Sequence, residues 1–149
     1  ISVDSLNSHL AWLYDIYLKT GLIVNFPIIA DQNGVIARKY GMISNDVSST
    51  ETVRNIFIID DKGIIRSIFV YPMNIGRYIP EILRTVTALQ YSDQNNCMTP
   101  ANWSPGNPMI VPPPKTFNAL RERNESINKN RNGMCWYLSF KNPETKKLE

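Results

Sequence analysis

The chain has 149 residues, of which 43% are hydrophobic and 19% are charged. These proportions allow a buried core and are too low in charge for a disordered chain. No apolar run approaches the roughly 20 residues of a membrane helix, and we expect no secretory leader. One histidine and two cysteines argue against a metal centre, a disulfide scaffold and a Ser–His–Asp triad. We therefore expect a cytoplasmic protein without membrane contact, metal or other cofactor.

The charges are unevenly distributed along the chain. Residues 1–92 contain eight basic and eight acidic residues, whereas residues 93–149 contain eight basic and five acidic residues and carry the whole net charge of +3. Seven of the ten prolines also follow residue 92. We place a domain boundary there. We expect no nucleic-acid binding, because this surplus is small beside the basic stripes of nucleic-acid binders.

The first predicted element is a helix over residues 6–19, with Ser5 as its N-cap and Gly21 at its end. Its apolar residues recur at the spacing of one helical face: Leu6, Leu10, Leu13 and Tyr17. Phe26–Ala30 predicts a short buried strand. A second, shorter helix follows over residues 35–40.

The strongest local pattern predicts an antiparallel hairpin. Two β-branched runs, residues 53–59 and 64–71, flank a turn, and we expect a bulge at Gly63. Because both runs are almost wholly apolar, we expect helices over both faces. Residues 44–51, which precede the hairpin, form a polar loop in this interpretation.

Residues 75–91 predict a third helix, with Pro80 in its first turn. The order helix, strand, helix, hairpin, helix indicates an α/β layer with a mixed sheet. Ile1–Asp4 has the pattern of the end of a buried strand, and a sheet of one strand and one hairpin is thin for these helices. We therefore expect that the chain lacks its natural beginning.

The C-terminal part contains looser patterns. Trp103 anchors a predicted extended stretch over residues 98–108. Pro112–Pro114 favours polyproline II, either as a rigid spacer or as a ligand for a proline-binding partner. Residues 121–133 predict an exposed helix end and loop, and Cys135–Phe140 predicts a short aromatic strand.

Arg54 is the most informative polar residue, because it begins an otherwise apolar strand. A buried guanidinium needs an anionic partner, which is either a loop carboxylate or a functional anion. Arg77 lies between a predicted strand and a predicted helix. At that position an arginine either orients an anion or is simply exposed.

Two thiols and one imidazole are further candidates. A reactive thiol needs a nearby cation or helix N-terminus, and neither Cys97 nor Cys135 has a CxxC partner. We predict that both are ordinary thiols. We expect His9 at the surface or in a capping role rather than in catalysis.

Nine short segments, taken in order, have a common pattern: Ser2–Ser5, His9–Trp12, Phe26–Asp31, Tyr40–Met42, Arg54–Asp60, Tyr71–Pro72, Gly76–Arg77, Glu81–Arg84 and Thr99–Trp103. Together they resemble the one-cysteine peroxiredoxins, over nearly the whole chain and roughly the last two thirds of a family member. The resemblance implies a thioredoxin-like mixed sheet with flanking helices, incomplete at the N-terminus. It also implies a C-terminal extension over residues 93–149 that is associated with a homodimer.

The implied activity is reduction of hydrogen peroxide or alkyl hydroperoxides by a cysteine that becomes a sulfenic acid and is restored by a thiol reductant. Arg54 matches the family arginine that favours the thiolate and binds the peroxide oxygens. Arg77 matches a second arginine that supports this network. Some relatives carry further cysteines near the terminal aromatic strand, so the resemblance also allows a resolving role for Cys135.

One departure concerns the nucleophile. The family's peroxidatic cysteine lies in a Pro-x-x-x-Thr-x-x-Cys motif that does not occur in this sequence. We therefore expect the C-terminal part of a peroxidase that is inactive alone. Two alternatives stay open: a non-catalytic thioredoxin-fold dimerisation or interaction module, and a thiol oxidoreductase that uses Cys97 or Cys135.

Overall fold

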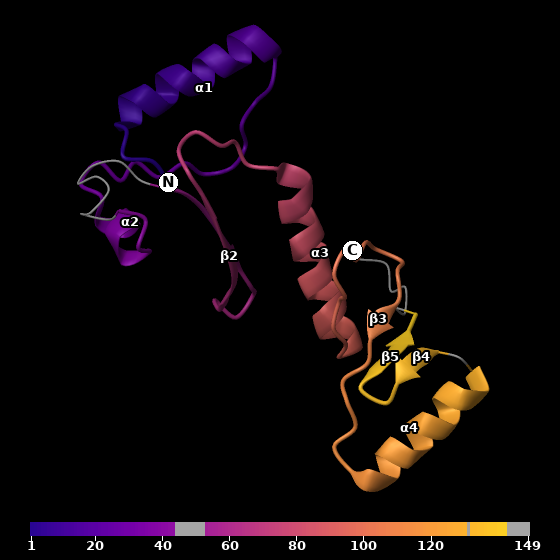
Figure 1. The fold of residues 1–149 in the computed structure, drawn as a ribbon. Coiled ribbons are helices and arrows are strands. Elements are labelled where there is room, and N and C mark those ends of the chain that lie inside the picture. The colour runs from indigo at the N-terminus through magenta and orange to yellow at the C-terminus, as the bar shows by residue number, and fades with distance from the viewer. Residues whose placement is uncertain (44–52, 131, 143–149) are drawn as a thin grey trace. The chain divides into compact units, whose positions relative to one another are not determined.

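The computed structural model describes residues 1–43, 53–130 and 132–142, which belong to two compact units, Ile1–Arg77 and Tyr78–Glu149 (Figure 1). The predicted polar loop over residues 44–51 lies outside the described residues. The predicted domain boundary after residue 92 falls in the last turn of helix α3 (Ile79–Asn95) and stays a prediction. None of the described helices is long and apolar enough to cross a membrane.

Helix α1 (Leu6–Thr20) confirms the first predicted element and both of its ends. The hydroxyl of Ser5 accepts a hydrogen bond from the Ser8 amide at 3.1 Å, which satisfies one of the free donors of the first turn. Gly21 ends the helix with a φ of 71°, a left-handed conformation that glycine adopts without a Cβ penalty.

The predicted strand at Phe26–Ala30 is wrong. Only Ala30 pairs, in an isolated parallel bridge with Ser2, through the Ser2 amide to the Ile29 carbonyl at 3.0 Å and the Asp31 amide to the Ser2 carbonyl at 2.8 Å. A strand needs a hydrogen-bonded neighbour along its length, and Ser2 is the one neighbour that the described residues supply. Phe26 is exposed as a result.

Helix α2 (Val35–Lys39) is the predicted short helix, and the carboxylate of Asp31 fixes its first turn. One oxygen of Asp31 accepts from the Ala37 amide at 2.8 Å and the other from the Ile36 amide at 3.2 Å. The hydrogen bond from Ala37 is the main reason that the pKa of Asp31 lies below its usual value of 3.8. A buried acidic side chain thus defines where this helix begins.

Strands β1 (Arg54–Ile59) and β2 (Ile65–Tyr71) form the predicted antiparallel hairpin. The extra residue of the bulge is Arg66, which lies between the partners of Ile58 and Ile59, and not Gly63. The expectation that both faces are covered is also wrong. Along β2, half-buried and exposed residues alternate, which is the ordinary pattern of an antiparallel strand with one covered face.

The turn of this hairpin is held by Asp60. Its carboxylate accepts from the amides of Lys62 and Ile64 at 3.0 and 2.9 Å, and from the Arg66 guanidinium at 3.3 Å. The Ile64 amide contributes most to a pKa of Asp60 below its usual value. Gly63 occupies the left-handed region there with a φ of 76°.

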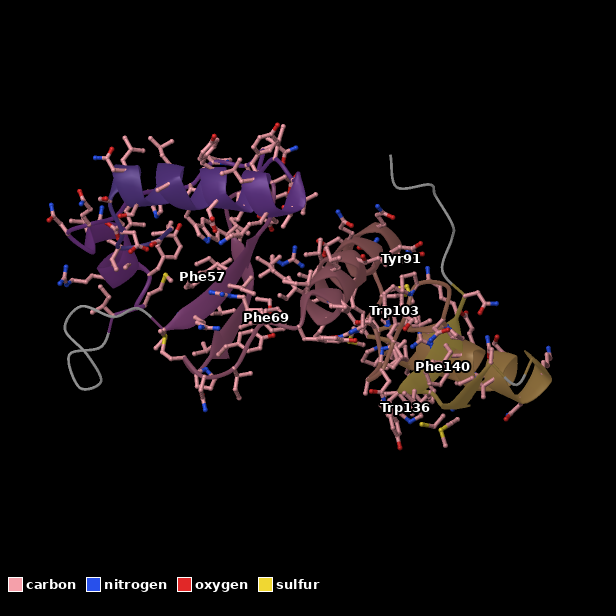
Figure 2. All side chains as sticks on the ribbon, turned by 90° about the horizontal axis from the view of Figure 1, so that it is seen from above. Phe57, Phe69, Tyr91, Trp103, Trp136 and Phe140 are labelled. Atoms are coloured by element: carbon pink, nitrogen blue, oxygen red, sulfur yellow. The ribbon has the colours of Figure 1, made fainter. Side chains whose placement is uncertain are left out.

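In the second unit, α3 begins at Ile79 rather than at residue 75, because Pro80 suits a first helical turn and the chain before Tyr78 is not helical. The buried core of this unit lies against α3 and consists of Ala88, Cys97, Trp103 and Met109. Tyr91 and Trp103 lie side by side, with ring centroids 5.3 Å apart (Figure 2). Trp103 therefore anchors the stretch over residues 98–108, but the prediction that this stretch is extended is wrong. The Trp103 amide donates to the Pro100 carbonyl at 3.2 Å and the Asn107 amide to the Ser104 carbonyl at 3.0 Å, and these hydrogen bonds close two turns.

The C-terminal elements are helix α4 (Phe117–Asn130) and a three-stranded antiparallel sheet of β3 (Met109–Ile110), β5 (Leu138–Lys141) and β4 (Gly133–Cys135), in that order. The predicted single strand Cys135–Phe140 is wrong, because the chain turns at Trp136 and Tyr137 and forms a hairpin. Both units together give a mixed α/β architecture.

Candidate functional site

Arg54 is the first residue of β1, opposite Tyr71 in the hairpin register, and its side chain is half-buried. Its guanidinium donates from Nη1 to the carbonyl oxygen of Ile75 at 3.4 Å. A guanidinium has five N–H donors. Within the described residues, the Arg54 side chain forms this one hydrogen bond. The remaining donors are thus not committed to any described acceptor.

Arg77 lies two residues beyond Ile75, in the segment between β2 and the start of α3, and it is exposed. The Ile75 amide donates to the Pro72 carbonyl at 3.1 Å, which closes a turn in this segment. Because Arg54 holds the carbonyl of the same Ile75, the turn that precedes Arg77 is attached to the beginning of β1. Arg54 is thus hydrogen-bonded to the segment that leads to Arg77.

The ion pairs of the described residues do not include these two arginines. Asp60, in the turn at the other end of β1 from Arg54, is paired with Arg66 at 3.3 Å. No described carboxylate forms an ion pair with Arg54 or Arg77. The alternative of a structural pair with a carboxylate of the loop at residues 44–52 lies outside the described residues and stays a prediction.

The two thiols belong to the second unit. Cys97 is 4% exposed and packs in the core, and its carbonyl accepts from the Ser92 hydroxyl at 2.5 Å. Cys135 is half-buried in β4, and its hydrogen bond with the Tyr137 phenol raises the pKa of Tyr137 above its usual value of 10.0.

His9 corrects an expectation. It is 6% exposed, and neither ring nitrogen has a hydrogen-bond partner among the described residues. It is therefore neither a surface residue nor the cap of α1, a role that Ser5 fills. Within the described part of the chain, no three His, Cys, Asp or Glu side chains gather in a way that could hold a metal ion.

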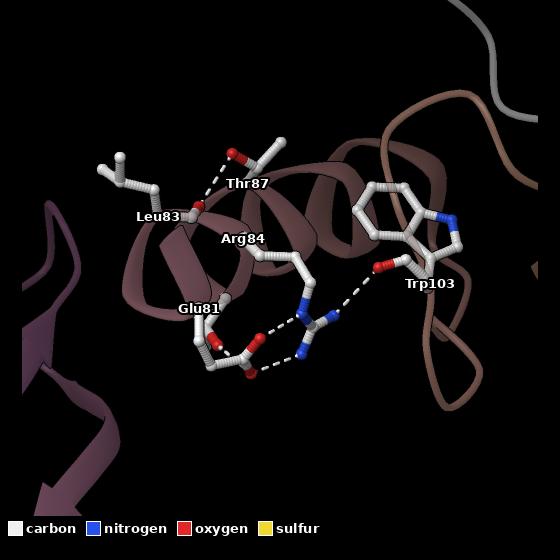
Figure 3. Close-up of polar contacts among 6 residues, drawn as sticks. Glu81, Leu83, Arg84, Thr87 and Trp103 are labelled. Carbon is white, nitrogen blue, oxygen red and sulfur yellow. Dashed lines mark hydrogen bonds and ion pairs between the residues drawn. The ribbon is translucent and has the colours of Figure 1, made fainter. Parts of the chain in front are cut away.

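The sequence did not lead us to predict one polar network, which is centred on Arg84. The Arg84 guanidinium forms a fork with the Glu81 carboxylate, Nε to Oε2 at 2.6 Å and Nη2 to Oε1 at 2.7 Å (Figure 3). Its Nη1 donates to the Trp103 carbonyl at 3.1 Å. The i,i+3 spacing of Glu81 and Arg84 could have indicated the ion pair. Nothing local could have indicated an acceptor 19 residues away.

Comparisons with known proteins show which families the chain is similar to. The family model of the AhpC/TSA family matches residues 1–68, and the model for the C-terminal domain of 1-Cys peroxiredoxin matches residues 88–126. Peroxiredoxin 2 of Caldanaerobacter subterraneus subsp. tengcongensis is 50% identical over 143 residues, which is 95% of this chain and 63% of that relative. A peroxiredoxin of Aquifex aeolicus is 42% identical, over 95% of this chain and 67% of its own length.

Solved structures show the same fold. A yeast mitochondrial 1-Cys peroxiredoxin matches with a TM-score of 0.77 at 36% identity, over 95% of this chain and 68% of its own. A cysteine-to-serine mutant of the peroxiredoxin 6 of Arenicola marina matches with a TM-score of 0.75 at 29% identity, over 97% of this chain and 69% of its own. The predicted thioredoxin-like α/β fold is therefore confirmed. The chain spans a little under two thirds of the length of the Caldanaerobacter relative.

Proposed function

Since the chain belongs to the peroxiredoxin family, we propose that it is the C-terminal part of a thiol-dependent peroxidase. The substrates would be hydrogen peroxide or alkyl hydroperoxides. The observation that carries the proposal is the half-buried guanidinium of Arg54, with N–H donors that no described acceptor uses. A cation so placed favours a thiolate and binds the oxygens of a peroxide.

In the proposed reaction, a cysteine thiolate attacks one peroxide oxygen and the O–O bond breaks. The sulfur becomes a sulfenic acid, the leaving oxygen takes the electron pair, and a proton then converts it to water or an alcohol. Negative charge moves from sulfur to the leaving oxygen during this step. The role of Arg54 is to donate hydrogen bonds to that developing charge, and Arg77 supports this network.

The peroxidatic thiolate would come from outside the 149 residues. No cysteine of this chain lies in the Pro-x-x-x-Thr-x-x-Cys motif. Cys97 is buried in a core, which restricts the access of a peroxide to its sulfur. Cys135 is the more exposed of the two thiols. For this reason we assign to Cys135 any redox reaction of a thiol in this chain.

The proposal includes three further properties. The intact peroxidase is a homodimer, in which residues 93–149 take part in the contact between subunits. It is located in the cytoplasm. Its reductant is a small thiol or a thioredoxin-like protein, in keeping with the yeast relative, whose structure concerns thiol resolution through glutathione and thioredoxin systems.

Peroxide consumption tests this proposal. The 149-residue chain should consume peroxide no faster than a free thiol does. A chimera that joins it to the part of the Caldanaerobacter relative without a counterpart here should reduce peroxide catalytically with dithiothreitol as reductant. An inactive but folded dimeric chimera would favour the non-catalytic interaction module. Turnover by the chain alone that disappears in Cys97→Ser or Cys135→Ser would favour the thiol oxidoreductase.

A further inference from the structure

The sequence contains the Asn–Gly dipeptide twice, as Asn33–Gly34 and as Asn132–Gly133. In this dipeptide the glycine backbone nitrogen can attack the amide carbon of the asparagine side chain, because glycine has no Cβ to hinder the approach. A C–N bond forms, ammonia leaves, and a cyclic succinimide remains. Water then opens the ring at either carbonyl and gives aspartate or isoaspartate. Since the nitrogen must lose its proton and the peptide group must rotate, the fold decides which dipeptide reacts.

The peptide group between Asn33 and Gly34 is held on both of its sides. The Gly34 amide donates to the Asp31 carbonyl at 2.8 Å, and the Arg38 guanidinium donates to the Asn33 carbonyl at 2.5 Å. Gly34 is also buried at the beginning of α2. Attack by the Gly34 nitrogen therefore requires that both hydrogen bonds break.

The Gly133 amide has no comparable partner. Gly133 and Ser139 are register partners in β4 and β5, and the Val111 amide donates to the Ser139 carbonyl at 2.9 Å, so the backbone groups of Ser139 face β3. In an antiparallel ladder this makes Gly133 and Ser139 a non-hydrogen-bonded pair, and the Gly133 N–H points away from β5. Because β4 is an edge strand (Figure 1), this N–H has no acceptor among the described residues.

Asn132 is loosely held as well. Its side chain is exposed and forms no hydrogen bond with the described residues. One hydrogen bond, from the Phe140 amide to the Asn132 carbonyl at 2.7 Å, holds the peptide group between Asn132 and Gly133. The end of a short edge strand opens locally at a small cost in free energy. We infer that Asn132 is a site of spontaneous deamidation, whereas its surroundings protect Asn33.

The fold requires the glycine that makes Asn132 reactive. A Cβ at position 133 would lie 2.7 Å from the Cα of Ser139 and 2.9 Å from the carbonyl oxygen of Leu138, which is too close for backbone atoms to accommodate. The same close approach of β4 to β5 makes the isoaspartyl product disruptive. Isoaspartate adds a methylene to the main chain, and it turns the carbonyl that accepts from Phe140 into a carboxylate outside the main chain. The pairing of β4 with β5 is then lost.

This modification has a consequence for Cys135, which lies in β4 two residues beyond Gly133 and is half-buried there. Loss of the β4–β5 pairing exposes the Cys135 thiol. The aspartyl product adds the same negative charge but leaves the length of the main chain unchanged, so the hairpin persists. Deamidation to isoaspartate thus increases the access of reagents to the more exposed of the two thiols.

Incubation of the full 149-residue chain at 37 °C and pH 8.5 tests the inference. Mass spectrometry of peptides measures the conversion of each amide to a carboxyl group, and an isoaspartyl methyltransferase detects isoaspartate. Asn132 should deamidate at least about tenfold faster than Asn33, which corresponds to roughly 1.4 kcal/mol of local opening at Asn33. In urea the two rates should converge, because the dipeptides are chemically alike. Equal rates in the folded chain, or a faster reaction at Asn33, would overturn the inference.

Two substitutions provide a matched control, because the longer side chain of glutamine disfavours the ring closure. Asn132→Gln should remove most of the isoaspartate that the folded chain accumulates, whereas Asn33→Gln should leave it nearly unchanged. Circular dichroism verifies that both variants are folded. The opposite pattern would place the reactive dipeptide in the first unit and would contradict the inference.

The structural consequence has its own test, for which Asn132→Asp supplies the charge without the additional methylene. Iodoacetamide should alkylate Cys135 at least about threefold faster in the purified isoaspartyl form of the chain than in Asn132→Asp, because the thiol no longer depends on local opening. Asn132→Asp should react like the unmodified chain. Equal rates for the isoaspartyl form and Asn132→Asp would contradict the loss of β4–β5 pairing.

Discussion

The guanidinium of Arg54 donates to the carbonyl of Ile75 across 3.4 Å, although the two residues are 21 positions apart. This hydrogen bond connects the first residue of β1 to the segment that contains Arg77. It uses one donor and holds the side chain near the end of the hairpin. A backbone carbonyl therefore orients the Arg54 side chain, and the other guanidinium donors have no acceptor among the described residues.

Arg84 should stabilise the second unit mainly through its hydrogen bond to the Trp103 carbonyl at 3.1 Å, rather than through its fork with Glu81. The ion pair itself is partly exposed and contributes little. Replacing Arg84 by leucine should lower the free energy of unfolding by about 1 kcal/mol, because one backbone acceptor loses its charged donor. Urea denaturation followed by circular dichroism measures this. Arg121→Leu, on the exposed side of α4, is the control and should change the value by less than about 0.5 kcal/mol.

Met109 and Met134 provide a matched pair of methionines in the second unit, 0% and 80% exposed. Met109→Ala should lower the free energy of unfolding by about 2–5 kcal/mol, because it removes a side chain from a packed core. Met134→Ala should have an effect below about 0.5 kcal/mol. Equal effects in urea denaturation would contradict the assignment of this core.

Asp31 should make the first unit sensitive to acid. Because its pKa is lower in the folded state than the usual 3.8, its contribution is complete above that value and is lost as the pH falls through the folded pKa. Asp31→Asn cannot ionise. The wild type should therefore unfold at a higher temperature than the variant at pH 7, and this difference should shrink as the pH falls below 3.8. A difference that stays constant down to pH 2 would argue against the carboxylate as the cause.

Local signals predicted much of the fold. Ser5 and Gly21 define α1 through interactions within a few residues, and the apolar runs around Asp60 define the β1–β2 hairpin. The errors concern elements that depend on distant partners. Phe26–Ala30 has strand-forming residues, but only Ser2 lies beside it among the described residues.

The candidate site was predictable only in part. Arg54 is recognisable because a charge in an apolar run is unusual. Its contact with Ile75, and that of Arg84 with Trp103, join residues 21 and 19 positions apart, and no periodicity encodes such pairs. The burial of His9 was missed for the same reason, since what covers a helical side chain depends on the rest of the fold.

The thiols should differ in reactivity in the folded protein. Cys97 is 4% exposed, so its alkylation requires local opening, whereas Cys135 is half-buried in a short strand. With iodoacetamide at pH 8, Cys135 should react at least about tenfold faster than Cys97, as followed by mass spectrometry of peptides. In urea the two rates should converge. Faster reaction at Cys97 in the folded chain would contradict its place in the core.

The central claim is that Arg54 stabilises the charge that develops when a thiolate attacks a peroxide. Its most direct test is the second-order rate constant of the peroxidase chimera with hydrogen peroxide. Arg54→Lys should lower this constant by about 10²-fold or more, because a lysine cannot present the planar fork of donors to the peroxide oxygens. Arg66→Lys in the same hairpin, where Arg66 is bound to Asp60, should leave it nearly unchanged. Equal rate constants for the two variants would contradict the account.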